Sequence, residues 1–254
     1  MNNTIIAVDI GNSTICVGLF VDGKLKHRLD TISSIDDILL FKQKFSHFLT
    51  SNHIDNKDIV GGLISSVVPS FTNTIKNDIL EVCSVTLDVM SLKHFSFIEM
   101  DIDNPRELGS DLASDLVACK NHYGYPSLII DMGTITKFLL LDKKGVFTGT
   151  SFFPGVNGCI NIMRSSTAQL PTISLDNKPK DLLGKNTIDA MKSGIYYPTL
   201  FFINGMKDEM RKKYPNIKLI LTGGNGNTFK DDLKDFIYDK DLILKGIYEI
   251  YINN

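Results

Sequence analysis

The sequence predicts an α/β protein made of two similar halves, and three observations support this. Apolar strand candidates alternate with segments of helical periodicity along the 254 residues. An apolar run ending in Asp-x-Gly occurs at 5–11 and again at 128–133, close to the middle of the chain. A glycine-rich turn follows a third apolar run at 218–221. We therefore expect two lobes of one design, at 1–112 and 113–254.

Composition narrows the class of protein. The 27 Lys and Arg nearly balance the 29 Asp and Glu, which gives no electrostatic reason to expect nucleic acid or an anionic membrane as partner. With 43% hydrophobic and 22% charged residues, the chain matches an ordinary soluble globular protein. No apolar stretch reaches the length of a membrane span, and the first residues lack the basic region of a signal peptide. We expect a cytoplasmic protein.

The four cysteines and five histidines are scattered and form no zinc-ligand or disulfide spacing, so we expect the cysteines to pack as small hydrophobic residues. His47 and His53 are expected at the surface. The Phe-rich stripe of 41–48 is expected in a helix core, and 207–213 on a solvated helix face.

The elements follow from apolar spacing, read in order along the chain. In the first half, strands are expected at 5–11, 15–21, 25–29, 60–65 and 85–89, and helices at 36–49, 72–82 and 110–122. In the second half, strands are expected at 128–133, 138–141, 146–153 and 217–221, and helices at 186–197 and 200–214. Turn residues at 22–24 and 142–145 separate matching strands of the two halves.

The repeated Asp-x-Gly loop points to phosphate chemistry. Gly11 lets the backbone approach a ligand closely, and the neighbouring Asn12 and Ser13 offer polar groups to phosphate oxygens. Asp9 at the strand end is suited to hydrated Mg²⁺. One such loop is weak evidence because Asp and Gly are common turn residues. Its second copy at Asp131, in the same strand frame, strengthens the prediction.

The third signature is Thr222, Gly223 and Gly224, where a strand ends in a glycine pair that permits flat backbone contact with a planar or phosphorylated ligand. A simple strand-to-helix turn is the alternative. Together with the two Asp-x-Gly loops, it resembles the acetate kinase/sugar kinase/Hsp70/actin superfamily. That resemblance implies two ribonuclease H-like lobes of the actin-like ATPase type around a central nucleotide cleft.

Further motifs resemble the type III pantothenate kinase family. They appear in family order and span nearly the whole chain: D-x-G-N-S at 9–13, N-P-x-x-x-G-S-D at 104–111, D-x-G-T-x-T at 131–136, P-G-V at 154–156, Q-L-P at 169–171, and G-K-N-T with A and S-G at 184–194. The resemblance implies ATP-dependent phosphorylation of pantothenate to 4′-phosphopantothenate, the first step of coenzyme A synthesis. It also implies Mg²⁺, a monovalent cation such as K⁺ or NH₄⁺, and a homodimer whose partner helps shape the pantothenate site.

The resemblance also implies roles for particular residues. Metal ions would lie at Asp9 and, for the monovalent cation, at Asp131. The ATP contacts implied are Asp9, Ile10, Gly11, Asn12, Ser13, Thr14, Ile15, Cys16, Thr134, Thr222, Gly223 and Gly224. The pantothenate contacts implied are Gly109, Ser110, Asp111, Leu112 and Thr187.

Asp111 would be the general base toward the pantothenate hydroxyl, although a carboxylate in a first helical turn is also what the helix dipole favours. Asp115 shares that dipole explanation and lacks the motif spacing. Thr187 has the alternative role of an ordinary helix N-cap.

Two departures from the family pattern bear on activity. Leu112 stands where the family has Arg, which can bind a carboxylate such as that of pantothenate, and Lys137 stands where another Thr is expected. Arg106 or Arg164 could supply the missing guanidinium. Two rival hypotheses follow, namely a non-catalytic nucleotide-binding regulator and a kinase of another small hydroxyl substrate. Smaller departures are Ser13 for Thr, Ser110 for Ala, and Ile102 and Asp103 in place of an aromatic residue.

Overall fold

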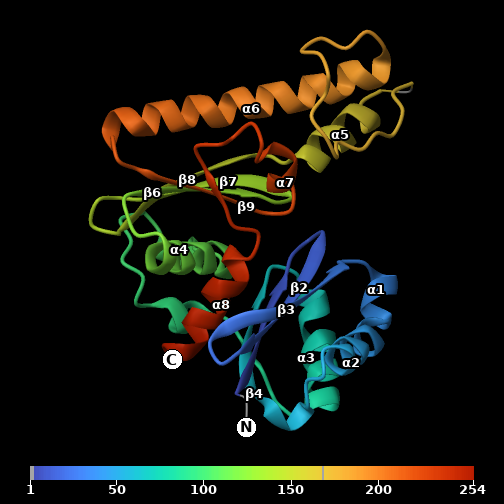
Figure 1. The fold of residues 1–254 in the computed structure, drawn as a ribbon, viewed down its shortest axis with the longest axis vertical. Helices are drawn as coiled ribbons and strands as arrows, with labels where there is room; N and C mark the ends of the chain where they lie inside the picture. Colours follow the sequence, from blue (N-terminus) through green and yellow to red (C-terminus); the bar gives the residue numbers. More distant parts are fainter. Residues whose placement is uncertain (1–2, 168) are drawn as a thin grey trace. The chain divides into compact units, whose positions relative to one another are not determined.

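The computed structural model describes residues 3–167 and 169–254, which form two compact units (Figure 1). The first unit contains the chain up to Glu99, Asp103–Ala118 and Asp241–Asn254. The second contains Met100–Ile102 and Cys119–Lys240. Each unit is built on one five-stranded sheet.

The first sheet has the strand order β3-β2-β1-β4-β5. Its strands are β1 (Thr4–Ile10), β2 (Thr14–Val21), β3 (Lys24–Ile32), β4 (Ile59–Ser66) and β5 (Asp88–Val89). β1 is antiparallel to β2 and parallel to β4. Because side chains alternate along a strand, Ile6, Val8 and Ile10 enter the core beneath two helices, and Asp9 lies on the opposite face.

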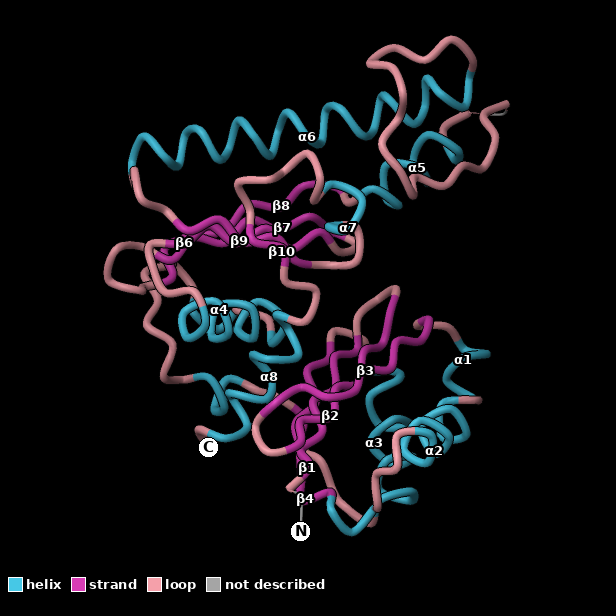
Figure 2. Tube along the Cα trace, viewed as in Figure 1, coloured by secondary structure: helices cyan, strands magenta, loops and turns pink. Residues whose placement is uncertain are grey.

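The helices of the first unit lie on both sides of this sheet, with α2 and α3 together on one side and α8 on the other (Figure 2). They are α1 (Ile35–Leu39), α2 (Phe41–Ser51), α3 (Pro69–Cys83) and α8 (Leu242–Ile252), with 3₁₀ turns at Asn56–Asp58, Leu92–Phe95 and Pro105–Glu107. α4 (Ser110–His122) begins in this unit and continues into the second. α2 and α3 form the core with β1, whereas α8 packs on β1 and β4.

The single helix expected at 36–49 is in fact two, α1 and α2, so that prediction was wrong. Ser34 caps α1, and the backbone N–H of Leu40 bonds back to the carbonyls of Asp37 and Ile38, which ends the helix. After this break between the two helices, Phe41, Phe45 and Phe48 point into the core, whereas Leu39 before it is 75% exposed. His47 and His53 are exposed, as expected.

The second sheet has the order β10-β9-β6-β7-β8. Its strands are β6 (Ser127–Met132), β7 (Ile135–Leu141), β8 (Phe147–Pro154), β9 (Lys218–Thr222) and β10 (Ile237–Tyr238). β6 is antiparallel to β7 and parallel to β9, which repeats the pairing of β1 with β2 and β4. The two sheets therefore match strand for strand, and the expected duplication is confirmed.

One helix, α6 (Thr187–Lys213), runs along a face of the second sheet, where two helices were expected (Figure 1). Pro198 lies between the two expected helices, at 186–197 and 200–214, and proline lacks the N–H donor that a helix interior needs. Tyr196 before the proline and Leu200 and Ile203 after it are buried in the same core. Packing on both sides of Pro198 keeps the helix continuous.

The helices α5 (Val156–Ser165), α7 (Gly226–Phe229) and α8 were not foreseen, and neither was strand β10. α8 also changes the domain description, because we expected 113–254 to form one lobe. A Cβ on Gly246 would lie 1.9 Å from the carbonyl oxygen of Ser114, so α8 packs backbone to backbone on α4. This contact joins the C-terminal segment to the first unit, and the division between the units falls within α4, after Ala118.

Two further predictions can be compared with the structure. Cys16, Cys83 and Cys119 are buried and Cys159 is half-buried, and all four are thiols, as expected. Among the described residues, no helix has the length and apolar character needed to cross a membrane.

Candidate functional site

The first Asp-x-Gly loop is a tight β-hairpin connection between β1 and β2. The backbone N–H of Gly11 donates to the carbonyl of Thr14 at 3.0 Å, and a Cβ on Gly11 would lie 3.1 Å from that oxygen. Asn12, Ser13 and Thr14 are exposed, and Asp9 is half-buried at the strand end. The loop therefore presents backbone and polar groups beside a carboxylate.

Other residues expected near ATP lie in the core. Ile10 and Ile15 are fully buried, and Cys16 is 7% exposed. Their side chains hold the hairpin in place, so any contact they make with a nucleotide involves their backbone.

The first unit brings Asp9 and Asp111 to the same edge of its sheet. Asp9 pairs with Ser65 on the parallel strand β4. The Ser65 hydroxyl lies 2.9 Å from that of Ser110, which opens α4 one residue before Asp111. A Cβ on Gly109 would lie 2.5 Å from Oδ1 of Asp111, so the glycine makes room for this carboxylate. Sequence reasoning missed Ser65, although its position at the end of an apolar strand could have indicated it.

The residues that follow Asp111 turn inward. Leu112 is 7% exposed and Asp115 is 1% exposed. Leu112 is therefore a buried apolar residue, with no group that can bind a carboxylate. Arg106, in the turn that leads to α4, is exposed.

The second Asp-x-Gly loop has the same backbone design and a different neighbour. Asp131 is buried near the end of β6, and Thr134 is exposed in the turn before β7. Nζ of Lys137, the cross-strand partner of Asp131, lies 2.8 Å from Oδ2 of that carboxylate. The site expected for a monovalent cation thus holds an ion pair.

The Thr222–Gly224 turn and the second loop form one structure. Thr222 pairs with Asp131 across β6 and β9. Gly223 has a φ of +84°, and a Cβ there would lie 2.5 Å from Oδ1 of Asp131, so both conformation and space require glycine. Asn225 donates its backbone N–H to Met132 at 3.0 Å and its side-chain amide to Gly133 at 3.2 Å. Sequence reasoning missed Asn225, whose signal was its position directly after the glycine pair.

Thr187 lies at the exposed start of α6. The helix is capped by Asn186, whose side chain accepts the N–H of Asp189 at 2.9 Å. The capping role considered for Thr187 is thus performed by its neighbour.

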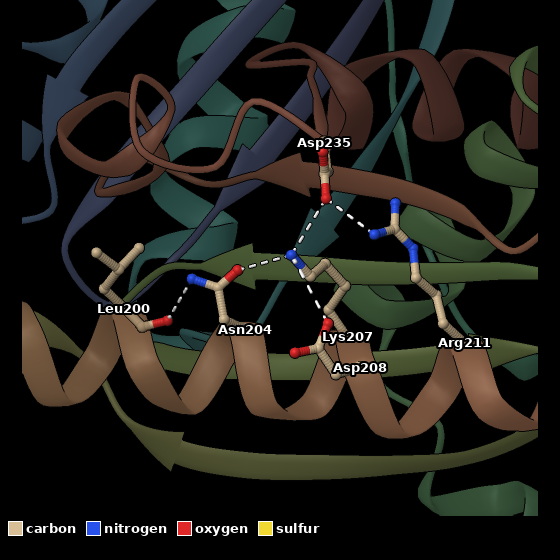
Figure 3. Close-up of polar contacts among 6 residues, drawn as sticks. All are labelled: Leu200, Asn204, Lys207, Asp208, Arg211 and Asp235. Carbon is tan, nitrogen blue, oxygen red and sulfur yellow. Dashed lines mark hydrogen bonds and ion pairs between the residues drawn. The ribbon is translucent and has the colours of Figure 1, made fainter.

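The face expected to be solvated at 207–213 is largely exposed, but Lys207 is drawn into polar contacts with neighbouring side chains (Figure 3). The Lys207 side chain is 13% exposed, and its ammonium lies 2.9 Å from Oδ1 of Asn204 and 3.1 Å from Oδ2 of Asp235. Arg211 reaches the same Asp235 oxygen at 2.9 Å. These cations lower the pKa of Asp235. The cluster borders a hollow of about 250 Å³ and ties α6 to 231–236.

Two sheets of identical topology, each with an acidic hairpin loop, define the actin-like ATPase and sugar kinase class of fold. Solved structures agree. A Campylobacter jejuni protein of the Baf family has a TM-score of 0.60 at 19% identity, covering 98% of both chains. Component A of (R)-2-hydroxyglutaryl-CoA dehydratase from Acidaminococcus fermentans has a TM-score of 0.54 at 11% identity, covering 98% of this chain and 96% of that one. At these identities the likeness shows the fold alone.

Sequence comparison identifies the family. The model of the type III pantothenate kinase family matches residues 5–209. A type III pantothenate kinase of Persephonella marina is 33% identical, covering 97% of this chain and 98% of the relative. One from a Sulfurihydrogenibium species is 32% identical, covering 96% and 98%. The chain belongs to the type III pantothenate kinase family. The predicted family, fold class and activity, an ATP-dependent pantothenate kinase, are confirmed at this level.

Proposed function

We propose that this chain transfers the γ-phosphoryl group of ATP to the primary hydroxyl of pantothenate, yielding ADP and 4′-phosphopantothenate. The observation that carries this proposal is the gathering of Asp9, Ser65, Ser110 and Asp111 at one sheet edge. A phosphoryl-transfer site needs a carboxylate for the metal ion and another for the incoming hydroxyl, held in fixed positions. The first unit supplies both on rigid elements.

Asp111 is proposed as the general base. It accepts the proton of the pantothenate hydroxyl as that oxygen attacks the γ-phosphorus, and ADP leaves. The contact between the Ser65 and Ser110 hydroxyls fixes the start of α4 and hence the position of Asp111. Ser65 and Ser110 are in this sense positioning residues.

Asp9 and the loop after it are proposed to hold Mg²⁺ and phosphate oxygens. The donors fit, because a half-buried carboxylate stands beside exposed Asn12 and Ser13 in a loop of oxygen and N–H groups. Bound Mg²⁺ would neutralise charge that develops on the phosphates. In the second unit, we assign Thr134 to ATP and the Thr222–Gly224 turn to a position beside the adenosine.

Recognition of pantothenate is proposed to involve Thr187 and Arg106. Leu112 is buried, whereas Arg106 is exposed in the segment leading to Asp111 and can bind a carboxylate through two parallel hydrogen bonds. Apolar side chains are exposed along α6 and just before it: Leu183 at 80%, Ile188 at 46% and Phe201 at 58%. A second copy that covers these residues would give the homodimer, which light scattering can test. We place the enzyme in the cytoplasm.

The test is Asp111→Asn, assayed for ADP release with ATP, Mg²⁺, K⁺ and pantothenate. We expect kcat to fall about 100- to 10,000-fold, the usual contribution of a general base, with ATP affinity within about threefold of wild type. Asp103→Asn, an exposed carboxylate before the same helix, is the matched control and should keep wild-type rates.

Three outcomes separate the hypotheses. Near wild-type activity of Asp111→Asn would remove Asp111 as the base. Nucleotide binding by the wild-type protein without ADP release would favour the non-catalytic regulator. ADP release with other hydroxy acids, but not with pantothenate, would favour the kinase of another substrate.

A further inference from the structure

The monovalent cation that the family resemblance places at Asp131 does not fit the residues found there. The carboxylate already has a cation, because Nζ of Lys137 lies 2.8 Å from Oδ2. The two side chains are only 18% and 12% exposed, so this pair is far better shielded from solvent than a surface salt bridge. A metal ion on the same oxygen would be repelled by the ammonium.

The second carboxylate oxygen faces the glycine turn. A Cβ on Gly223 would lie 2.5 Å from Oδ1, so the backbone of that turn packs closely against it. Lys137 and the turn thus border the two oxygens of Asp131 from different sides. The neighbouring Asn225 holds this turn to the loop by its bonds to Met132 and Gly133.

Resting on the proposed function, we propose that the Lys137 ammonium takes the place of the monovalent cation, so that this enzyme needs neither K⁺ nor NH₄⁺. The Lys137 ammonium and a bound monovalent cation would each place a single positive charge beside Asp131. The tethered ammonium has no binding equilibrium to satisfy, and its strand fixes its position before ATP arrives. The phosphate-binding loop is therefore preorganised at any potassium concentration.

The first test measures ADP release in tetramethylammonium chloride and in KCl of equal ionic strength. Wild type should show rates within about twofold in the two salts. Lys137→Thr, which restores the residue expected from the family motif, should lose about tenfold in tetramethylammonium and recover with K⁺ or NH₄⁺, since tenfold is the scale of one charge-assisted hydrogen bond. Lys178→Thr is the matched control, because Lys178 also pairs with an aspartate, Asp232 at 2.7 Å, on the same unit. It should create no cation dependence.

The second test is thermal unfolding in the same salts, which does not depend on turnover. Lys137→Thr should show a Tm about 2–4 °C higher in KCl, because the cation binds only the folded state. Wild type and Lys178→Thr should show equal Tm values in both salts.

Each outcome is decisive for one proposal. A wild-type enzyme that loses about tenfold or more without K⁺, or whose Tm rises with K⁺ as much as that of Lys137→Thr, overturns this inference, even if the variant fails to fold. Absence of pantothenate-dependent ADP release in every salt overturns the proposed function instead, and the Tm comparison then still decides the role of Lys137.

Discussion

The two hairpin loops of this protein share a backbone design and differ in the residue that faces the aspartate across the hairpin. Asp9 and Asp131 occupy equivalent positions near the ends of β1 and β6. Across the hairpin, Asp9 pairs with Cys16, whereas Asp131 pairs with Lys137. Burial raises the pKa of the Cys16 thiol, which therefore stays neutral at physiological pH. Lys137 places a positive charge on its aspartate.

The duplicated fold thus repeats the backbone geometry, while the residue that pairs with each aspartate across its hairpin differs in charge. Asp9 faces a thiol across the hairpin, and Nη2 of Arg28 lies 3.4 Å from Sγ of that cysteine. Asp131 is compensated by a residue of the chain itself. The first loop is thus the one proposed to hold Mg²⁺, whereas the second is stabilised by an internal ion pair.

Replacing each aspartate in turn tests this difference between the two loops and has the largest expected effect on kcat. Asp9→Asn should lower kcat about a thousandfold, since it removes the carboxylate proposed to hold Mg²⁺. Asp131→Asn should lower kcat only about tenfold, because it breaks an ion pair that holds the loop. Mg²⁺ titrations of both variants, with circular dichroism as a check on folding, measure the difference. Equal losses in the two variants would contradict the asymmetry.

Converting the first loop to the charge pattern of the second should have a smaller effect. In Cys16→Lys, an ammonium would stand beside Asp9 as Lys137 stands beside Asp131, and it would compete with Mg²⁺. We expect about a 30-fold higher Mg²⁺ requirement, with kcat partly restored at saturating Mg²⁺. Cys16→Met, which adds a neutral side chain of similar length, is the control for packing. A Cys16→Lys enzyme with an unchanged Mg²⁺ requirement would show that this position does not set the charge at Asp9.

Much of this arrangement could be predicted from the sequence because it depends on local patterns. The Asp-x-Gly loops and the flanking strands follow from apolar runs and turn residues, and the repeat indicated that the two sheets would match. The positions of Asp9 and Asp131 at strand ends required no long-range information.

The features that could not be predicted depend on contacts distant in sequence. α8 joins the first unit through the close approach of Gly246 to Ser114, more than a hundred residues earlier. The helix α6 continues through Pro198 because its core contacts outweigh the local preference to stop. The sequence showed Lys137 as a departure from a motif, whereas its ion pair with Asp131 required the register of β6 and β7.

The smallest effect is expected at the residues that pair with the two aspartates on the parallel neighbouring strands. Ser65 pairs with Asp9, and Thr222 pairs with Asp131. Ser65→Ala removes the hydroxyl contact with Ser110 at 2.9 Å, which should cost about 1 kcal/mol of unfolding free energy and lower kcat about fivefold by loosening Asp111. ATP affinity should not change, and Ser65→Thr, which keeps a hydroxyl, should recover most of the rate. Thr222→Val removes the hydroxyl at the equivalent position of the second unit. It should act on the KM for ATP and leave kcat within about twofold, because that turn is proposed to lie beside the adenosine and positions no general base. A loss in Ser65→Ala confined to KM for ATP would show that Ser65 serves the nucleotide instead of the base.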